Sequence, residues 1–234
     1  GPDRRWHVVD LVEGTPTPRS TREEWTYDGR KLELAAGYDP TTGTLSWYKD
    51  AAGRQTSFHY NPLLQLSSIV RAGDSDAKPT VAFDYLYGNP LSQIVTRSRA
   101  QVGAAALLEK HHYYDGLGRD LGLVEEAPGG KTVTSGLKIF GPNGRVVREF
   151  EPTFTSGFDL VDAPKGLAFT AHRYDALGRQ FRSVLPDGTA SETRYAPLRV
   201  EHWDAEDLDP RSKHKDTPRV EHLNALGIAQ VDED

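Results

Sequence analysis

Four acidic residues lie close together near the C-terminal end of the sequence: Asp204, Glu206, Asp207 and Asp209. Carboxylate oxygens at such short spacing are ligands that a hard cation such as calcium prefers. The EF-hand pattern is not met, because the segment lacks the central glycine and the distal bidentate glutamate. We predict no metal site, keep these four residues as candidates for one, and interpret the segment as a solvated or salt-bridged surface loop.

The eight histidines are the second group that could bind a metal. Zinc-binding histidines recur at fixed spacings such as H-E-x-x-H, and no such spacing occurs here. His111 and His112 are consecutive. Consecutive strand residues point to opposite faces of a sheet, so these two side chains cannot easily share one ion. We expect the histidines to be strand residues with ordinary polar partners, and we predict no cofactor.

No motif for nucleophilic or acid–base catalysis is recognisable. The sequence contains no cysteine, and therefore no thiolate nucleophile and no disulfide, and it has no G-x-S-x-G motif. Glu23-Glu24 and Glu125-Glu126 are adjacent pairs. Catalytic carboxylates of glycosidases instead face each other across a sugar, so we interpret these pairs as charges that blunt strand edges. The sequence predicts a protein that is not an enzyme.

A five-residue pattern, D-x-x-G-R, recurs along the chain and is its most informative feature. Its full copies are Asp50, Gly53 and Arg54; Asp115, Gly118 and Arg119; and Asp175, Gly178 and Arg179. Degenerate copies are YDGR from Tyr27, GPNGR from Gly141 and NALGI from Asn224. Repetition of this kind indicates one structural unit used several times.

Each pentamer has the composition of a tight hairpin turn. In the copy at 175–179, Asp175 can accept hydrogen bonds from backbone amides ahead of it, and Gly178 can adopt the positive φ that closes the turn. The flanking segments mix β-branched, aromatic and polar residues, and helical periodicity is almost absent. The pattern therefore predicts an all-β fold of antiparallel hairpins and meanders.

The arginines and tyrosines around the turns have structural and functional interpretations. We expect Arg54, Arg119 and Arg179 to pair with the turn aspartate or a neighbouring acidic residue and to stack on a tyrosine. The alternative is an arginine ladder that binds an acidic partner. Tyrosines near expected strand ends favour stacking along the sheet over a sugar-binding platform. They are Tyr27, Tyr38, Tyr60, Tyr85, Tyr114, Tyr174 and Tyr195.

Composition excludes two classes of partner. The net charge of −6 comes from 34 acidic and 28 basic residues interleaved along the chain, which leaves no basic stripe to follow a nucleic-acid backbone. No apolar run approaches the roughly 18 residues of a membrane span. Gly1-Pro2 resembles the scar of a removed purification tag, and methionine is absent. We therefore expect residues 3–234 to be a single repeat array, excised from a larger protein.

Three segments depart from the hairpin pattern. Residues 102–110, VGAAALLEK, have high helix propensity but are too few for a helix without tertiary support, so helix and strand both remain open there. Two longer connections, about 152–169 and 197–218, are expected to be insert loops, and the second carries the acidic quartet in an exposed position. Thr132 to Phe140 is expected to be one strand.

The aromatic-Asp-x-x-Gly-Arg pattern resembles the YD-repeat family, which includes Rhs proteins, teneurins and the B components of insecticidal ABC toxin complexes. The resemblance covers most of Trp25 to Gly227. The strings FGPNGRVVREFEPTF from Phe140, RYDALGRQFRSVLPDGT from Arg173, and WDAEDLDP with KHKDTP look most like the shell of the toxin B component. The autoproteolytic segment of the family has no match here, so no catalytic residue is carried over.

This resemblance implies a curved, solenoid-like β-sheet that is part of a hollow shell around a toxin or another C-terminal cargo. The implied partners are flanking YD repeats, the enclosed cargo and possible further toxin-complex subunits, and the implied location is outside the bacterium. Unpaired edges of such a fragment predict self-association. The alternative function is an extracellular module that binds carbohydrate or a cell surface.

Overall fold

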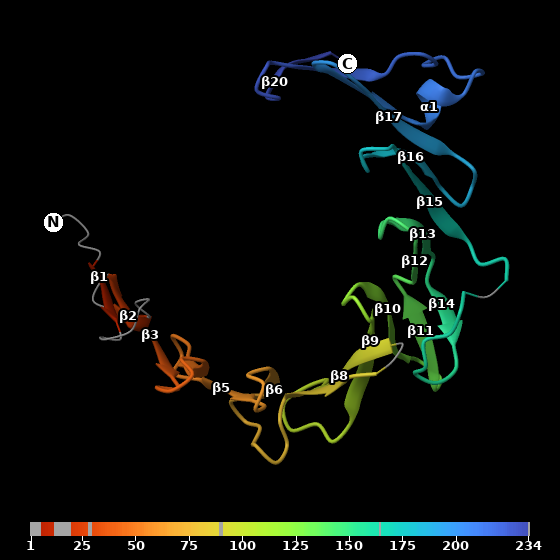
Figure 1. The fold of residues 1–234 in the computed structure, drawn as a ribbon. Coiled ribbons are helices and arrows are strands. Elements are labelled where there is room, and N and C mark those ends of the chain that lie inside the picture. Colours follow the sequence, from red (N-terminus) through yellow and green to blue (C-terminus); the bar gives the residue numbers. More distant parts are fainter. Residues whose placement is uncertain (1–5, 12–19, 28–29, 89–90, 164, 234) are drawn as a thin grey trace. The chain divides into compact units, whose positions relative to one another are not determined.

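The computed structural model describes residues 6–11, 20–27, 30–88, 91–163 and 165–233. The expected tag scar at Gly1-Pro2 and the centre of the YDGR turn, Asp28-Gly29, lie outside the described residues. The chain divides into two compact units, residues 1–111 and residues 112–234 (Figure 1). The boundary falls within strand β9 (Leu107–Asp115).

Unit 1 is an antiparallel meander in which each strand pairs with the next one along the chain. The register shifts by one residue beside several turns, as between His59 and Tyr60 of β5. Its strands before β9 are β1 (Trp6–Leu11), β2 (Ser20–Tyr27), β3 (Arg30–Tyr38), β4 (Leu45–Lys49), β5 (Gln55–Tyr60), β6 (Leu66–Arg71), β7 (Val81–Leu86) and β8 (Leu91–Arg99).

Unit 2 contains a group of three paired strands, β10, β11 and β14, and a sheet of eight. The three strands are β10 (Asp120–Ala127), β11 (Lys131–Ser135) and β14 (Thr153–Thr155). The eight-stranded sheet has the order β12-β13-β15-β16-β17-β18-β19-β20, with every neighbouring pair antiparallel. Its strands are β12 (Lys138–Phe140), β13 (Val146–Phe150), β15 (Phe169–Tyr174), β16 (Gln180–Val184), β17 (Ala190–Ala196), β18 (Arg199–Trp203), β19 (Arg219–Leu223) and β20 (Ala229–Glu233).

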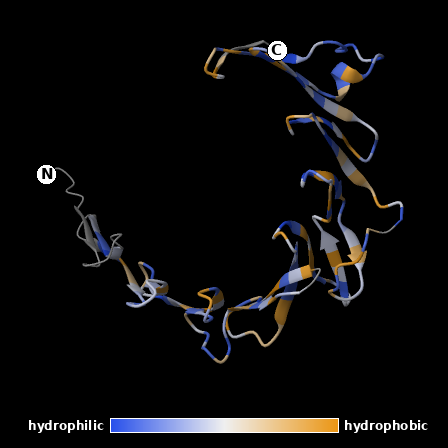
Figure 2. Ribbon diagram, in the orientation of Figure 1, coloured by the Kyte–Doolittle hydropathy of each residue, from blue (hydrophilic) through white to orange (hydrophobic). Residues whose placement is uncertain are grey.

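The hydrophobic core of the described residues is thin. Among the described residues, the largest side chains with less than 2% of their surface exposed are Val95 in unit 1 and Val124 in unit 2. Hydrophobic and hydrophilic residues are interspersed along the described strands of both units (Figure 2). A single hairpin buries too little apolar surface to fold alone, so each depends on its neighbours for ladder hydrogen bonds and packing.

The all-β antiparallel prediction is confirmed, and several local expectations are corrected. For residues 102–110, where helix and strand both remained open, the structure has no helix, and Leu107 to Lys110 belong to β9. Cross-strand partners such as Arg97 of β8, which bonds Glu109, outweigh helix propensity. The strand expected over 132–140 is split between β11 and β12, because the chain turns at Gly136, whose φ is +61°.

The two expected insert loops also contain regular structure. Strand β14 lies within 152–169. The segment 197–218 contains β18 and a one-turn helix, α1 (Ala205–Leu208), so the irregular connection is confined to residues either side of that helix. In the described part of the chain, no helix is long and apolar enough to cross a membrane.

Candidate functional site

The D-x-x-G-R segments form turns with one hydrogen-bond pattern. At 175–179, the N–H of Asp175 donates to the carbonyl oxygen of Arg179, and the N–H of Gly178 donates to that of Asp175, both at 2.9 Å. Asp175 Oδ1 accepts from the backbone N–H groups of Leu177 and Arg179. The φ of Gly178 is +77°, which glycine adopts without a steric penalty. The copies at 50–54 and 115–119 have the same bonds.

The arginine of each turn also bonds the aspartate of its own turn. The distance from Nε to Oδ2 is 2.8 Å for Arg54 and Asp50, 2.6 Å for Arg119 and Asp115, and 2.7 Å for Arg179 and Asp175. In Asp115, the backbone N–H of Arg119 is the main cause of a lowered carboxyl pKa, with the guanidinium contributing further. The aspartate and arginine charges of each repeat therefore pair with each other inside the turn.

Tyrosine hydroxyls join neighbouring hairpins. Tyr174 Oη donates to the carbonyl oxygen of Val146, the first residue of β13, at 2.8 Å. Tyr195 Oη donates in the same way to Gln180, the first residue of β16. In unit 1 the equivalent bonds run from Tyr60 to Leu45 and from Tyr85 to Leu66. Each hydroxyl satisfies a backbone carbonyl just beyond an earlier turn.

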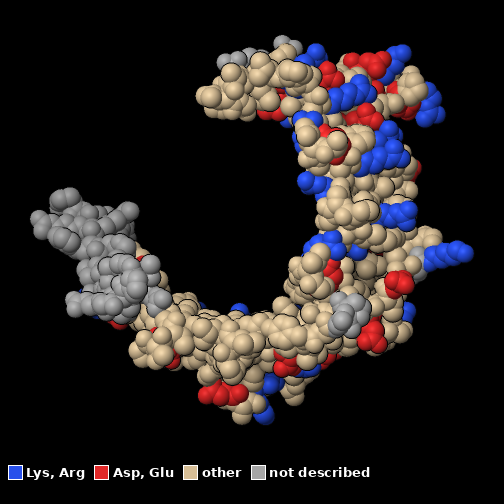
Figure 3. Space-filling view, viewed as in Figure 1, with Lys and Arg blue, Asp and Glu red and all other residues tan. Residues whose placement is uncertain are grey.

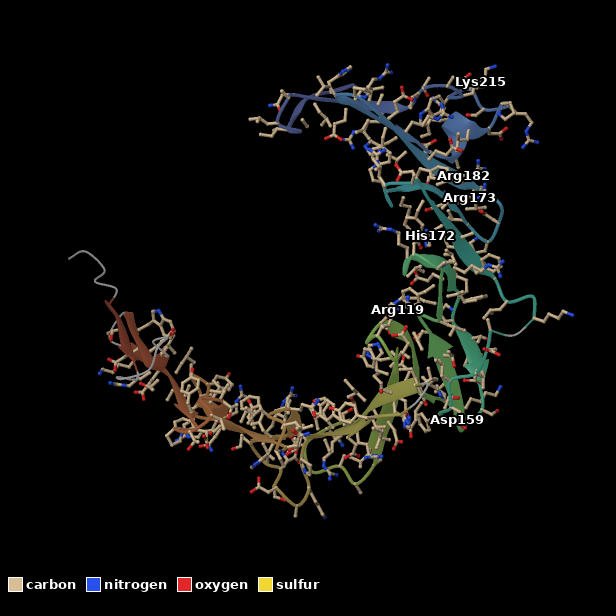
Figure 4. All side chains as sticks on the ribbon, viewed as in Figure 1. Arg119, Asp159, His172, Arg173, Arg182 and Lys215 are labelled. Carbon is tan, nitrogen blue, oxygen red and sulfur yellow. The ribbon has the colours of Figure 1, made fainter. Side chains whose placement is uncertain are left out.

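Arginines at the turns lie over aromatic rings that come later in the chain. The Arg119 guanidinium carbon is 4.4 Å from the Phe140 ring centroid, and that of Arg179 is 4.1 Å from the Tyr195 centroid. The Arg145 guanidinium lies 5.5 Å from the Tyr174 ring. Such cation–π contacts hold a turn to the following hairpin, and the labelled Arg119 marks one of them (Figure 4).

One turn was missed by the sequence pattern. Residues 61–65, NPLLQ, have the same backbone bonds, from Asn61 N–H to the Gln65 carbonyl and from Leu64 N–H to the Asn61 carbonyl. Asn61 Oδ1 accepts from the N–H groups of Leu63 and Gln65. Leu64 takes the glycine position with a φ of +59°. The asparagine followed by proline was the available signal, since both favour turns.

Two residues of the acidic quartet, Asp204 and Asp207, form a capping box at the start of a helix. Asp204 is the N-cap of α1, and its Oδ1 accepts from the N–H groups of Glu206 and Asp207. Asp207 is 8% exposed. Its Oδ2 accepts a hydrogen bond from the Asp204 N–H, and its Oδ1 accepts one from the Thr217 hydroxyl. The expectation of an exposed loop is therefore wrong for Asp207, because these donors compensate for the burial of its charge.

Among the described residues, no group of three or more His, Asp or Glu side chains could hold a metal ion. In the same quartet, Asp209 accepts from Arg211, whose guanidinium is the main cause of the lowered pKa of the Asp209 carboxyl. Acidic and basic side chains are intermixed around this part of unit 2 (Figure 3).

A hollow of about 620 Å³ adjoins this segment in unit 2. Strands β17 and β18 form one side, and α1 with the residues that follow it forms another. It is lined by Ser191, Glu192, Thr193, His202, Trp203, Asp204, Glu206, Asp207, His214, Thr217 and Arg219. Sequence reasoning had no means of bringing these residues together, because they come from three strands and a connection.

The paired histidines have separate partners. His111 bonds Gln93 and Glu109, at 2.8 Å and 2.7 Å. His112 Nε2 lies 2.8 Å from Asp120, whose second oxygen bonds Lys138. Partial burial raises the pKa of Asp120, but hydrogen bonds from Lys138 and His112 outweigh it, so that the pKa is lowered.

Exposed leucines mark one edge of the eight-stranded sheet. Because neighbouring strands are antiparallel, the turns after β15, β17 and β19 lie at the same edge. Leu177, Leu198 and Leu226 lie in these turns and are 75%, 55% and 83% exposed. Leu185, 43% exposed, lies in the turn after β16 at the opposite edge. These turns therefore place three exposed leucines along one edge of the sheet.

No protein-family model matches the sequence. No curated protein matches it. Solved structures do match. The crystal structure of TcdB2-TccC3 without its hypervariable C-terminal region has a TM-score of 0.72 and 13% identity, over 97% of this chain and 17% of that chain.

The crystal structure of TcdB2-TccC3 matches with a TM-score of 0.69 and 15% identity, over 97% of this chain and 15% of that chain. The Photorhabdus luminescens Tc holotoxin pore with the mutation TccC3-D651A matches with a TM-score of 0.68 and 12% identity, over 97% of this chain and 17% of that chain. The chain thus spans about a sixth of these solved chains and shares their fold.

Proposed function

We propose that this chain is a non-catalytic stretch of a YD-repeat β-shell and that its hairpins form part of a wall around a polypeptide cargo. The carrying observation is that the distinctive residues of each repeat bind the repeat itself or its neighbour. The Asp–Arg pairs close the turns, and the tyrosine hydroxyls and arginine–aromatic contacts join successive hairpins. A wall needs this mutual support, because each hairpin has little core of its own.

Enclosure of a cargo is supported by the leucine edge, which we define as Leu177, Leu198 and Leu226. Leu177 and Leu226 are among the most exposed apolar residues described, and more than half of the Leu198 surface is exposed. An unfolded polypeptide offers apolar side chains that such an edge can cover, and burial of each leucine contributes up to about 2 kcal/mol. In this proposal the other partners are flanking repeats and another toxin-complex subunit, and the protein acts outside the bacterium.

Binding of an unfolded polypeptide tests the cargo role. We expect the 234-residue chain to bind reduced, carboxymethylated α-lactalbumin in a fluorescence-anisotropy titration. Combining Leu177→Ser with Leu226→Ser should weaken that binding by about tenfold, through the loss of two apolar contacts. Circular dichroism should show the same β content as the parent chain.

The matched control is Leu185→Ser, in the same sheet but at the opposite edge. It should leave the affinity within about twofold of the parent, since it lies outside the leucine edge. Equal losses in the two variants, or no binding of the unfolded probe by the parent chain, would contradict the cargo role.

A further inference from the structure

The hollow beside α1 has the size of a small-molecule site. Its volume of about 620 Å³ lies within the range of pockets that hold small ligands. The connection that forms one side is fixed in place. The Asp216 N–H donates to the carbonyl of the buried Asp207, and the Thr217 hydroxyl donates to its carboxylate. Asp216 adopts a φ of +61°, a strained conformation for a residue with a Cβ.

Most carboxylates that line the hollow already accept hydrogen bonds. Glu192, between Ser191 and Thr193, points to the opposite face of β17, where it accepts from Arg182 at 2.8 Å and from Arg194 at 3.2 Å. Asp204 and Asp207 accept from the backbone and from Thr217, as described above. A cation would have to displace these donors, so the hollow is a poor site for calcium despite its acidic residues.

The donors in the hollow form a row across three strands. Thr193 of β17 is directly opposite His202 of β18, and His202 is directly opposite Arg219 of β19. Residues directly opposite in antiparallel strands lie on the same face of the sheet, with Cβ atoms about 5 Å apart. His202 also lies 3.6 Å from Glu221. Ser191, two residues before Thr193, lies on the same face and also lines the hollow.

His214 completes this group from the connection after α1. It lines the hollow, and its backbone N–H donates to the Ser212 hydroxyl oxygen at 3.0 Å. A guanidinium, two imidazoles and two hydroxyls together suit oxygen atoms that carry negative charge. Arginine in particular binds carboxylate and phosphate groups through two parallel hydrogen bonds.

We propose that this hollow binds a small organic anion, whose carboxylate or phosphate oxygens contact Arg219, His202 and His214, with Ser191 and Thr193 as further donors. The site is distinct from the leucine edge and does not depend on the proposed wall function. It gives a role to the segment WDAEDLDPRSKHKDTP, which the hairpin repeats do not explain.

Titration of the 234-residue chain with citrate and, separately, inorganic phosphate tests the proposal. Isothermal titration calorimetry should show saturable binding of one anion per chain for at least one of the two. The backbone amide signals of Thr193, His202 and His214 should shift in NMR spectra during that titration. Glucose, which is neutral, and calcium chloride should leave these signals in place.

Two pairs of variants locate the site. Arg219→Gln should weaken binding by about tenfold or more, because it removes a charge-assisted hydrogen bond. Its control is Arg199→Gln, outside the hollow, which should change the affinity by less than about twofold. His214→Gln should weaken binding although it keeps the backbone bond, and its neighbour Lys215→Gln, labelled in Figure 4, should not.

Three results would overturn the proposal. The first is the absence of saturable citrate or phosphate binding at millimolar concentration. The second is an equal loss in Lys215→Gln and His214→Gln, which would indicate only general attraction of anions. The third is a shift of the same signals by calcium, which would make the hollow a cation site. Failure of the cargo experiment with intact anion binding would leave this proposal standing.

Discussion

Two turns of the same shape, 175–179 and 61–65, are built from different residues. Both have the same pair of backbone hydrogen bonds, and in both a side-chain oxygen of the first residue accepts two further N–H groups. The fourth residue is Gly178 in one and Leu64 in the other, with φ of +77° and +59°. The comparison teaches that the first polar residue and the backbone bonds define the turn, and that a glycine only relieves its strain.

Replacement of Gly178 by valine should have the largest effect. A Cβ at this position would displace the guanidinium of Arg145 from the Tyr174 ring, and the positive φ is strained for any β-branched residue. We expect Gly178→Val to lower the free energy of unfolding by about 2 kcal/mol or more, measured by urea denaturation.

The matched control for this prediction is Gly188→Val in the same sheet. Gly188 has a φ of +88°, but no atom lies within 4 Å of the position of its Cβ. Only the backbone strain applies, so the loss should be nearer to about 1 kcal/mol. Equal midpoints for Gly178→Val and the parent chain would show that residue 178 does not have a positive φ.

Asp207 and Glu206 both lie in α1, which is outside the repeated hairpins, and they differ in how their side chains are bonded. Asp207→Ala removes the acceptor for the Asp204 N–H and the Thr217 hydroxyl, and we expect a loss of about 1–2 kcal/mol. Glu206→Ala, at an exposed position of the same helix, should change stability by less than about 0.5 kcal/mol. Similar thermal midpoints for the two variants would contradict a fixed connection at 204–218.

Removal of one tyrosine hydroxyl should have a moderate effect. Tyr174→Phe keeps the ring beneath Arg145 and deletes only the bond to the Val146 carbonyl. The expected loss is about 1 kcal/mol in urea denaturation, because a part-buried acceptor loses its donor. A loss too small to measure would show that this hydroxyl does not join the two hairpins.

Leu64→Gly should produce the smallest change, and it should be a gain. Glycine relieves the positive φ at 64, while its greater freedom in the unfolded chain offsets part of that benefit. We expect stabilisation of about 0.5 kcal/mol or slightly more. Destabilisation would mean that the exposed Leu64 side chain makes contacts that matter more than its strain.

The turns that contain aspartate, glycine and arginine could be predicted from the sequence, because each of these residue types has a specific task in the turn. The turn at 61–65 could not be, since leucine is disfavoured at positive φ and only the surrounding bonds hold it there. The sequence also did not decide between helix and strand for the start of β9. Helix propensity is local, whereas strand pairing depends on distant residues such as Arg97.

The candidate site was the least predictable part. The acidic residues from Asp204 to Asp209 suggested a cation, whereas the structure uses Asp204 and Asp207 as acceptors for backbone and hydroxyl donors. The row formed by Thr193, His202 and Arg219 depends on the register of three strands. Register follows from pairing across the sheet, and the sequence pattern alone does not specify it.

Residue-resolved hydrogen exchange of the parent chain and Tyr174→Phe tests the central claim, that neighbouring hairpins support one another. We predict that amides of β13 exchange faster in the variant together with those of β15 and β16, while amides of β18 and β19 are unchanged. Joint opening of β13 with β15 is expected because the hydroxyl connects them. Faster exchange confined to β15 and β16 would contradict the account.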